Sequence, residues 1–164
     1  MLLAYCEQHD AEEASPKKAQ GFFQGGVHYV TNGQSTVDQT QLGLYFSDQP
    51  LSREQRVQAI GTRFVLPPNT PELALQASHL LDENIMITGV RARMNYRGKK
   101  MRFEVEAPSG ISTQLFSVPA FNYGWQPHYL LNDPVSVSAG STLRVTGALD
   151  NSASNPTNPD PDLE

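Results

Sequence analysis

Two neighbouring segments of the sequence alternate apolar and polar residues with the period of a β-strand. In Ile85–Tyr96 the even-numbered residues from Val90 onwards are apolar, and in Met101–Glu106 every second residue is apolar and the others are charged. Side chains point to opposite sides along an extended chain, so each segment has one face suited to a core. The intervening Arg97–Lys100 contains Gly98, which favours a turn. These features predict an antiparallel hairpin with one buried face.

The same texture extends over most of the chain. Gly and Pro occur 12 times each in 164 residues, which is too often for a helical bundle and suits short strands joined by turns. Residues 72–81 have a composition that would also suit a helix, but their alternation favours a strand. Further strands are predicted at residues 22–30, 42–46, 62–66, 113–118, 135–138 and 142–149. We therefore predict an all-β fold, a jelly-roll or Greek-key β-sandwich of eight or nine strands.

The length of the chain favours a single β-sandwich domain over residues 21–164. Residues 1–20 are predicted to be a poorly ordered lead-in, because charged residues are interleaved there with Ala and Ser. Residues 52–59 are interpreted as a surface connection. The Pro- and Asn-rich tail from about residue 151 cannot be a central strand, since each Pro lacks a backbone donor. It is expected to be an ordered loop or a loose end.

Charge and hydropathy exclude several classes of partner. The net charge of −5 argues against duplex nucleic acid, because phosphate binding needs an excess of Lys and Arg. The longest apolar run, Met1–Cys6, is far shorter than the roughly 18 residues that span a bilayer. Cys6 is the single cysteine, so it makes no intrachain disulfide. We expect no nucleic-acid partner and no membrane span.

Four groups of segments carry a family resemblance. They are Val27–Gly33 with Leu42–Phe46; Tyr96–Lys99; Trp125–Gln126 with Tyr129; and Asp150–Ala153 with Asn155–Pro156 and Asn158–Pro161. Together they resemble the C-terminal domain of the copper type II ascorbate-dependent monooxygenases, the peptidylglycine α-hydroxylating and dopamine β-monooxygenase group. The order and spacing agree over nearly the whole chain from Gly21. The resemblance implies a jelly-roll β-sandwich, in agreement with the fold predicted from the residues.

In that family, the resemblance implies, a His-x-His pair and a Met near the domain's end hold a copper ion that binds dioxygen. Residues two apart on a strand share a face, so two imidazoles can reach one ion. Arg93 and Asn95 occupy the positions that match the His pair. A guanidinium offers no lone pair and its positive charge opposes a cation, while the amide is at best a weak oxygen ligand. The matching Met would follow Asn158–Pro161, and the sequence ends at Glu164.

These departures lead us to expect a non-catalytic β-sandwich module without catalytic residues, without a bound metal and without a cofactor. Such a module would be a structural or binding subunit of a larger extracytoplasmic assembly. The family uses two domains, which also argues against activity of this chain alone. The alternative is a fragment of a copper- and ascorbate-dependent monooxygenase whose other domain and ligands lie outside this chain. In that case copper would be the cofactor and C–H hydroxylation the reaction.

The resemblance also implies a neighbour and a compartment. Without the family's terminal strand, one sheet edge would present unpaired backbone groups. We expect it to be covered by the chain's own first residues, by a protein partner or by another domain of a parent protein. A periplasmic or extracellular location follows from the resemblance only.

A second alternative is an anion-binding module. Six of the 12 Lys and Arg residues lie between residues 91 and 102, a stretch without Asp or Glu. Arg91 and Arg93 share a strand face and together suit a carboxylate, sulfate or phosphate, or an acidic partner. Arg97, Lys99 and Lys100 would extend this site. The other interpretation is a solvated hairpin whose charges prevent an exposed strand from pairing with neighbours.

Other candidate side chains receive structural interpretations beside functional ones. The aromatic residues of 121–129, including Trp125, suit either stacking on a sugar ring or a partner, or filling of the core. His28 and His79 are expected to be satisfied within the sandwich, and His9 lies near Cys6 without the spacing of a metal site. No Gly-x-Ser-x-Gly elbow and no phosphate-binding loop occurs, so hydrolase and nucleotide chemistry are unsupported.

Overall fold

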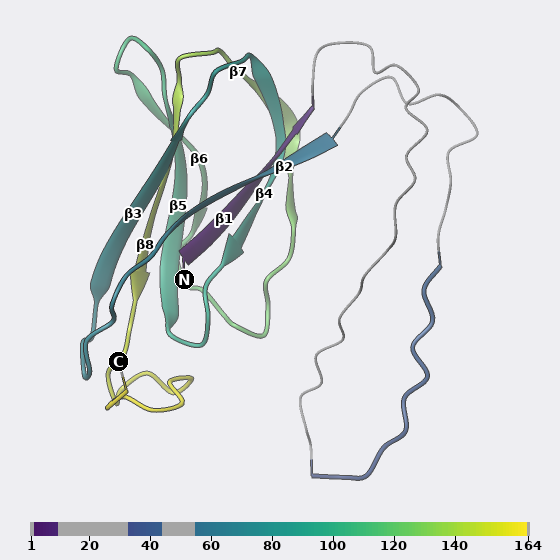
Figure 1. Cartoon of the computed structure of the whole chain (residues 1–164), viewed down its shortest axis with the longest axis vertical. Helices are drawn as coiled ribbons and strands as arrows, with labels where there is room; N and C mark the ends of the chain where they lie inside the picture. The colour runs from purple at the N-terminus through teal and green to yellow at the C-terminus, as the bar shows by residue number, and fades with distance from the viewer. Residues whose placement is uncertain (1, 10–32, 44–54, 164) are drawn as a thin grey trace.

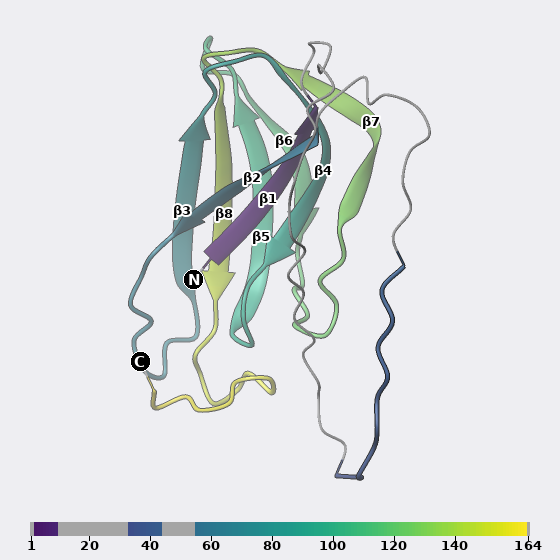
Figure 2. The same ribbon diagram turned by 45° about the vertical axis from the view of Figure 1, so that its right-hand side comes forward.

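The chain forms two antiparallel β-sheets that pack face to face (Figures 1 and 2). The computed structural model describes residues 2–9, 33–43 and 55–163, with only the backbone for residues 2–9. The described strands are β1 (Leu2–His9), β2 (Gln55–Thr62), β3 (Leu73–Leu80), β4 (Ile85–Arg93), β5 (Gly98–Glu106), β6 (Ser112–Val118), β7 (Tyr129–Val137) and β8 (Thr142–Leu149). The predicted all-β sandwich is confirmed.

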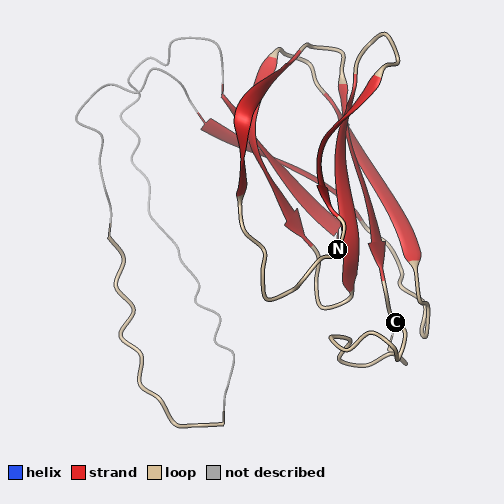
Figure 3. Cartoon of the chain, turned by 180° about the vertical axis from the view of Figure 1, so that it is seen from behind, coloured by secondary structure: helices blue, strands red, loops and turns tan. Residues whose placement is uncertain are grey.

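The order of strands in the first sheet is β2-β1-β4-β7, and in the second it is β3-β8-β5-β6. Every adjacent pair is antiparallel. Seen from behind, the described chain consists of strands and loops (Figure 3). No helix long and apolar enough for a membrane span is found among the described residues. The jelly-roll order stays a prediction, because residues 10–32 and 44–54 lie outside the described chain.

The core lies between the sheets and follows from alternation. In β5, Met101, Phe103 and Val105 are buried, and the register places Phe103 opposite the buried Val145 of β8. The Phe103 ring meets the Phe116 ring of β6 edge-on, with centroids 6.4 Å apart. Burial of a side chain of this size stabilises a fold by about 1.5–3 kcal/mol. The alternating pattern of residues 101–106 therefore determines which face of the second sheet turns inward.

A β-bulge at Thr88 divides β4 into two halves. Ile87 and Gly89 are opposite Gln8 and Glu7 of β1, so Thr88 has no partner there, and the pairing with β7 is also interrupted between Ile87 and Gly89. An extra residue reverses the phase of the alternation beyond it. Ile85 and Ile87 are buried before the bulge, whereas Val90, Ala92 and Met94 are buried after it. The change of apolar phase in Ile85–Tyr96 thus has a structural cause.

The first twenty residues differ from the expected lead-in. Residues 2–9 form β1, which lies inside the first sheet with β2 on one side and β4 on the other. Residues 10–20 lie outside the described chain. The sequence did not reveal this strand, because the charged residues of 1–20 leave no continuous apolar face. The partners of β1 also lie far away in the sequence, so local pattern does not indicate the pairing. The chain's own first residues therefore pair with β2 and β4 in the first sheet.

Some strand boundaries also differ from the prediction. Residues 55–62 form β2 where a surface connection was expected, and residues 63–66 are outside any strand. Only Ile60 of β2 is buried, so the hydrophobic pattern of this edge strand was too weak to reveal it. The turn after β4 is centred on Tyr96–Arg97, one to two residues before the predicted turn. The predicted hairpin is wrong, because β4 belongs to the first sheet and β5 to the second, so this turn connects the two sheets and the two strands do not pair. Residues 22–30 and 44–46 lie outside the described chain, and residues 42–43 are not in a strand.

Candidate functional site

The two positions that the resemblance places at the copper-binding histidines, Arg93 and Asn95, lie at the end of β4. Arg93 is the last residue of the strand and Asn95 follows in the chain toward the turn; both are exposed, and Met94 between them is buried. Their arrangement agrees with extended backbone, in which residues two apart lie on one side. Among the described residues, no group of three or more His, Cys, Asp or Glu side chains is placed to hold a metal ion. The end of β4 therefore presents a cation and an amide to solvent.

The turn that follows β4 is tied to the C-terminal tail by Arg97. The backbone N–H of Gly98 donates to the Asn95 carbonyl at 2.8 Å and closes the turn. The Arg97 guanidinium donates from Nε to Asn151 Oδ1 at 2.6 Å and from Nη2 to the Asp160 carbonyl at 2.7 Å. Bonds with a charged donor are the stronger kind. Arg97 therefore holds the tail against the β4–β5 turn, and its part in an anion site stays a prediction.

Asn151 is the buried centre of this connection. Its side-chain oxygen accepts from Arg97 and, at 3.0 Å, from Asn158 Nδ2. Its Nδ2 donates to the carbonyls of Pro67 at 3.0 Å and Leu163 at 2.9 Å. The residue is fully buried, and these four bonds use the whole capacity of the amide. One side chain thus links the residues before β3, the β4–β5 turn and the tail.

The tail is ordered by a repeated local motif. A side-chain oxygen accepts from the backbone N–H two residues further on, which is the geometry of an Asx turn. This occurs at Asp150, Asn155, Asn158 and Asp160. In addition, Thr157 Oγ1 donates to the Tyr96 carbonyl at 2.7 Å. Of the two outcomes expected for residues 151–163, the ordered loop is the one observed.

Two further cations of the basic stretch are paired with one carboxylate. Glu72, just before β3, lies 2.7 Å from Lys100 Nζ and 2.9 Å from Lys99 Nζ. Hydrogen bonding to Lys100 and Lys99 lowers the pKa of Glu72 to about 2, and hydrogen bonding to Glu72 raises the pKa of Lys99. The partly exposed cluster connects the start of β5 with the residue that precedes β3. Lys99 and Lys100 are therefore engaged in ion pairs within the protein.

The six cations between residues 91 and 102 do not form one surface. Arg91 and Arg93 project from β4 in the first sheet, whereas Arg102 is exposed on β5 in the second sheet. No hydrogen bond or ion pair joins Arg91 or Arg93 to any group that the structure describes. Five residues were predicted for an anion site. Of these, only Arg91 and Arg93 are exposed, share a strand face and make no hydrogen bond or ion pair with the described residues.

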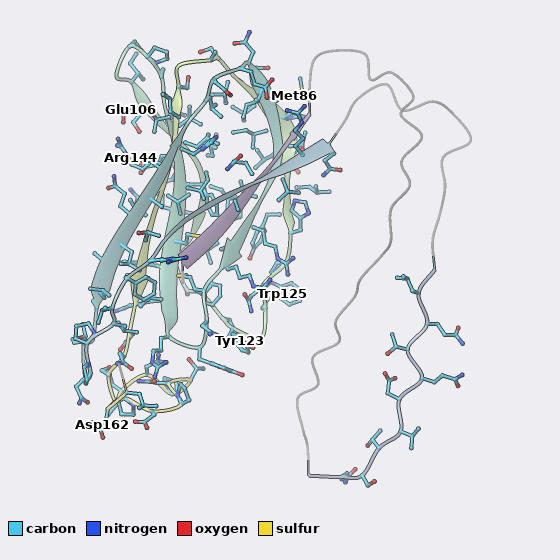
Figure 4. The ribbon with its side chains drawn as sticks, in the orientation of Figure 1. Met86, Glu106, Tyr123, Trp125, Arg144 and Asp162 are labelled. Atoms are coloured by element: carbon cyan, nitrogen blue, oxygen red, sulfur yellow. The ribbon has the colours of Figure 1, made fainter. Side chains whose placement is uncertain are left out.

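The aromatic segment 119–128 lies beside the same end of the sandwich. The rings of Tyr96 and Tyr123 are tilted by 34° with centroids 3.9 Å apart, and side-chain hydrogen bonding to Tyr123 raises the pKa of Tyr96. Asn122 closes a tight turn by accepting from Gly124 N and Trp125 N, at 2.8 and 3.0 Å. Trp125 keeps 69% of its surface exposed (Figure 4). Phe121 and Tyr129 pack against the core, as the structural interpretation expects, whereas stacking on a sugar ring or a partner stays a prediction for Trp125.

The histidines do not converge. His79 is half-buried in β3 and opposite the buried Leu143, as expected for a histidine on the apolar face. His128 covers Gly89, since a Cβ built on that glycine would lie 2.5 Å from His128 Nε2. The side chains of His9 and His28 lie outside the described part. Elsewhere, Glu106 of β5 and Arg144 of β8 form an ion pair on the outer face of the second sheet (Figure 4).

Two residues that the sequence did not reveal organise this end of the molecule, Asn151 and Glu72. Asn151 lies two residues after the end of the apolar strand β8, in a segment rich in Asn and Pro, which is a weak signal for a buried polar residue. Its partners are 7 to 84 residues away in the sequence. Comparison of the chain with protein-family models, curated proteins and solved structures gives no match.

Proposed function

We propose that this chain is a non-catalytic β-sandwich module, built like the C-terminal domain of the copper type II ascorbate-dependent monooxygenases. It would be a structural or binding subunit of a larger extracytoplasmic assembly, with a protein partner on an exposed sheet edge. One observation carries the proposal: Arg93 and Asn95 stand exposed where the family resemblance requires two histidines. A permanently protonated guanidinium repels a metal cation and cannot coordinate it.

The placement of the other family-like residues supports a scaffold role. Tyr96–Lys99 and Asp150–Pro161 were two of the segments that carried the resemblance, and they contact each other through Arg97, Asn151 and Thr157. These hydrogen bonds hold the β4–β5 turn against the tail, and none of them involves Arg93 or Asn95. The two segments therefore have a structural role that does not require copper. The extracytoplasmic location rests on the resemblance alone.

Copper titration tests this proposal. The unmodified chain is titrated with Cu²⁺ and followed by electron paramagnetic resonance, with the Arg93→Ala/Asn95→Ala variant as the matched control. We expect no tight, stoichiometric type II signal, and identical weak background from both proteins. One equivalent of tightly bound Cu²⁺ in the unmodified chain, lost in the variant, would remove the proposal.

Anion binding by Arg91 and Arg93 is a second candidate, favoured by their exposure on one strand face without a described partner. An anion that binds only the folded state raises the melting temperature. We expect inorganic phosphate to raise it more for the unmodified chain than for Arg91→Gln/Arg93→Gln. The variant Lys99→Gln/Lys100→Gln is the control, since it removes as much charge from residues that pair with Glu72. Equal shifts in all three proteins would exclude this site.

A further inference from the structure

Strand β1 has an unusual relation to the rest of the first sheet. It lies between β2 and β4, and every residue from Leu2 to His9 is opposite a residue of β2. On its other side it pairs with Arg93 to Met86 of β4. Within this sheet, β1 is the only described neighbour of β2, which forms the edge. The place of β2 in the first sheet therefore depends on β1.

The connection from β1 to β2 comprises residues 10–54 and is long for two adjacent strands. Antiparallel neighbours need a loop of only a few residues. The described part of the connection, residues 33–43, is exposed at every position, and Val37 keeps 94% of its surface. This part stands clear of both sheets in three views (Figures 1, 2 and 3). A chain of this length can extend over roughly 150 Å, far more than the width of one sheet.

We propose that β1 is exchanged between copies of this chain, so that residues 2–9 of one copy fill the place between β2 and β4 of another. The occupant is a second copy of this chain, because residues 2–9 have partners in both β2 and β4. The same strand from another copy would form the same backbone pairs. Exchange of an identical element preserves the hydrogen bonds of the sheet, so the exchanged and unexchanged forms differ mainly in the connection. The long connection allows either form. This inference is independent of the missing copper ligands.

The sheet itself favours occupation of this place. Without β1, the backbone groups of β2 and of one side of β4 would lose their partners, and such edges pair readily with another strand. The exchanged form grows with protein concentration, since the linked strand competes at an effective concentration in the millimolar range or below. Exchange in both directions gives a closed dimer, and exchange in one direction gives open chains of copies.

The single cysteine provides the test. Cys6 of β1 is directly opposite Gln58 of β2, and opposed positions in an antiparallel pair lie within disulfide range. The unmodified chain is mixed with the variant Cys6→Ser/Gln58→Cys, and the two are unfolded, refolded together at high concentration and oxidised. A disulfide between the two chains then requires β1 of one copy beside β2 of the other. The variant Cys6→Ser/Gln55→Cys is the control, because Gln55 is opposite His9.

We expect the mixed 6–58 disulfide to exceed the mixed 6–55 disulfide several-fold. Equal yields would overturn the proposal. The variant Gln58→Cys, refolded alone at high dilution, is expected to form the disulfide within one chain, and failure to do so would also overturn the proposal, because β1 would not lie beside β2. Native mass spectrometry needs no substitution. Isotope-labelled and unlabelled copies refolded together should give mixed dimers, and monomers alone up to millimolar concentration would refute the exchange.

Discussion

Removal of the Asn151 side chain should destabilise the protein more than most surface substitutions. The variant Asn151→Ala loses one bond from the charged Arg97 Nε and three bonds with Asn158, Pro67 and Leu163. A bond with a charged group contributes about 1.5–3 kcal/mol and a neutral one about 0.5–1.5 kcal/mol. Part of this is recovered, because the half-buried Arg97 can turn to water. We therefore expect a loss of about 3–5 kcal/mol, at the upper end for single substitutions.

Thermal and urea unfolding followed by circular dichroism measure this loss. For a domain of this size, each kcal/mol corresponds to roughly 2–4 °C, so the melting temperature should fall by roughly 6–20 °C. Asn132→Ala is the control, since Asn132 is exposed and no hydrogen bond of its side chain is found in the described structure. It should change the stability by less than about 0.5 kcal/mol. A loss of unfolding free energy below about 1 kcal/mol for Asn151→Ala would refute the reasoning, because removal of a buried amide leaves its four hydrogen-bond partners unsatisfied.

A double-mutant cycle separates the Arg97 bond from the rest. Arg97→Met keeps much of the aliphatic stem of Arg97 and removes its donors to Asn151 and Asp160. Combined with Asn151→Ala, it should show a coupling free energy of about 1–3 kcal/mol, because both variants remove the same bond. Additive effects would mean that the tail is held without the Arg97–Asn151 contact.

Two further predictions concern the contacts around the β4–β5 turn. The pKa of Glu72 is lowered to about 2, so its contribution is present above its ordinary value of 4.5 and is lost as the pH falls through about 2. The stability difference between the unmodified chain and Glu72→Gln should thus shrink between pH 4.5 and 2 in thermal unfolding, and a difference that does not vary with pH would contradict the pairing with Lys99 and Lys100. A Cβ on Gly98 would lie 2.5 Å from the Phe121 ring and 2.6 Å from Met94 Cβ. Gly98→Ala should therefore cost about 1–3 kcal/mol in urea unfolding, whereas Gly124→Ala, with its nearest neighbour at 3.4 Å, should be close to neutral; equal effects would show that the packing at Gly98 yields freely.

The strands with a buried face could be predicted from the sequence because burial imposes a period of two. Strand β5 keeps that period from Met101 to Glu106 and β8 keeps it from Thr142 to Gly147, and β3 was assigned correctly from alternation despite a composition that suits a helix. Local pattern was sufficient there, since each strand alone shows which side faces the core. The turn between β4 and β5 was placed within two residues for the same reason, but local pattern could not show that the two strands belong to different sheets.

Strands β1 and β2 could not be predicted, since what forms them is their pairing with each other across residues 10–54. The side chains of β2 are exposed except at Ile60 and partly buried positions, so its sequence carries little period. The same limit applies to the candidate site. Arg97 and Asn151 are 54 residues apart, and their contact follows from the packing of the tail on the β4–β5 turn. Arg93 and Asn95 could be singled out because the resemblance rests on local spacing and needs no long-range contact, and their match to the copper-binding positions stays a prediction.

The bulge at Thr88 explains why these arginines face solvent at all. Ile85 and Ile87 face the core, so uninterrupted alternation would turn Gly89, Arg91 and Arg93 inward. Two unpaired guanidinium groups in an apolar core would cost far more than one interrupted pair of backbone hydrogen bonds. The bulge does carry a cost, since Thr88 Oγ1 is buried and no partner for it is found in the described structure. One additional residue in β4 thus allows the strand to combine an apolar first half with a basic second half, and it determines which side of the first sheet presents Arg91 and Arg93.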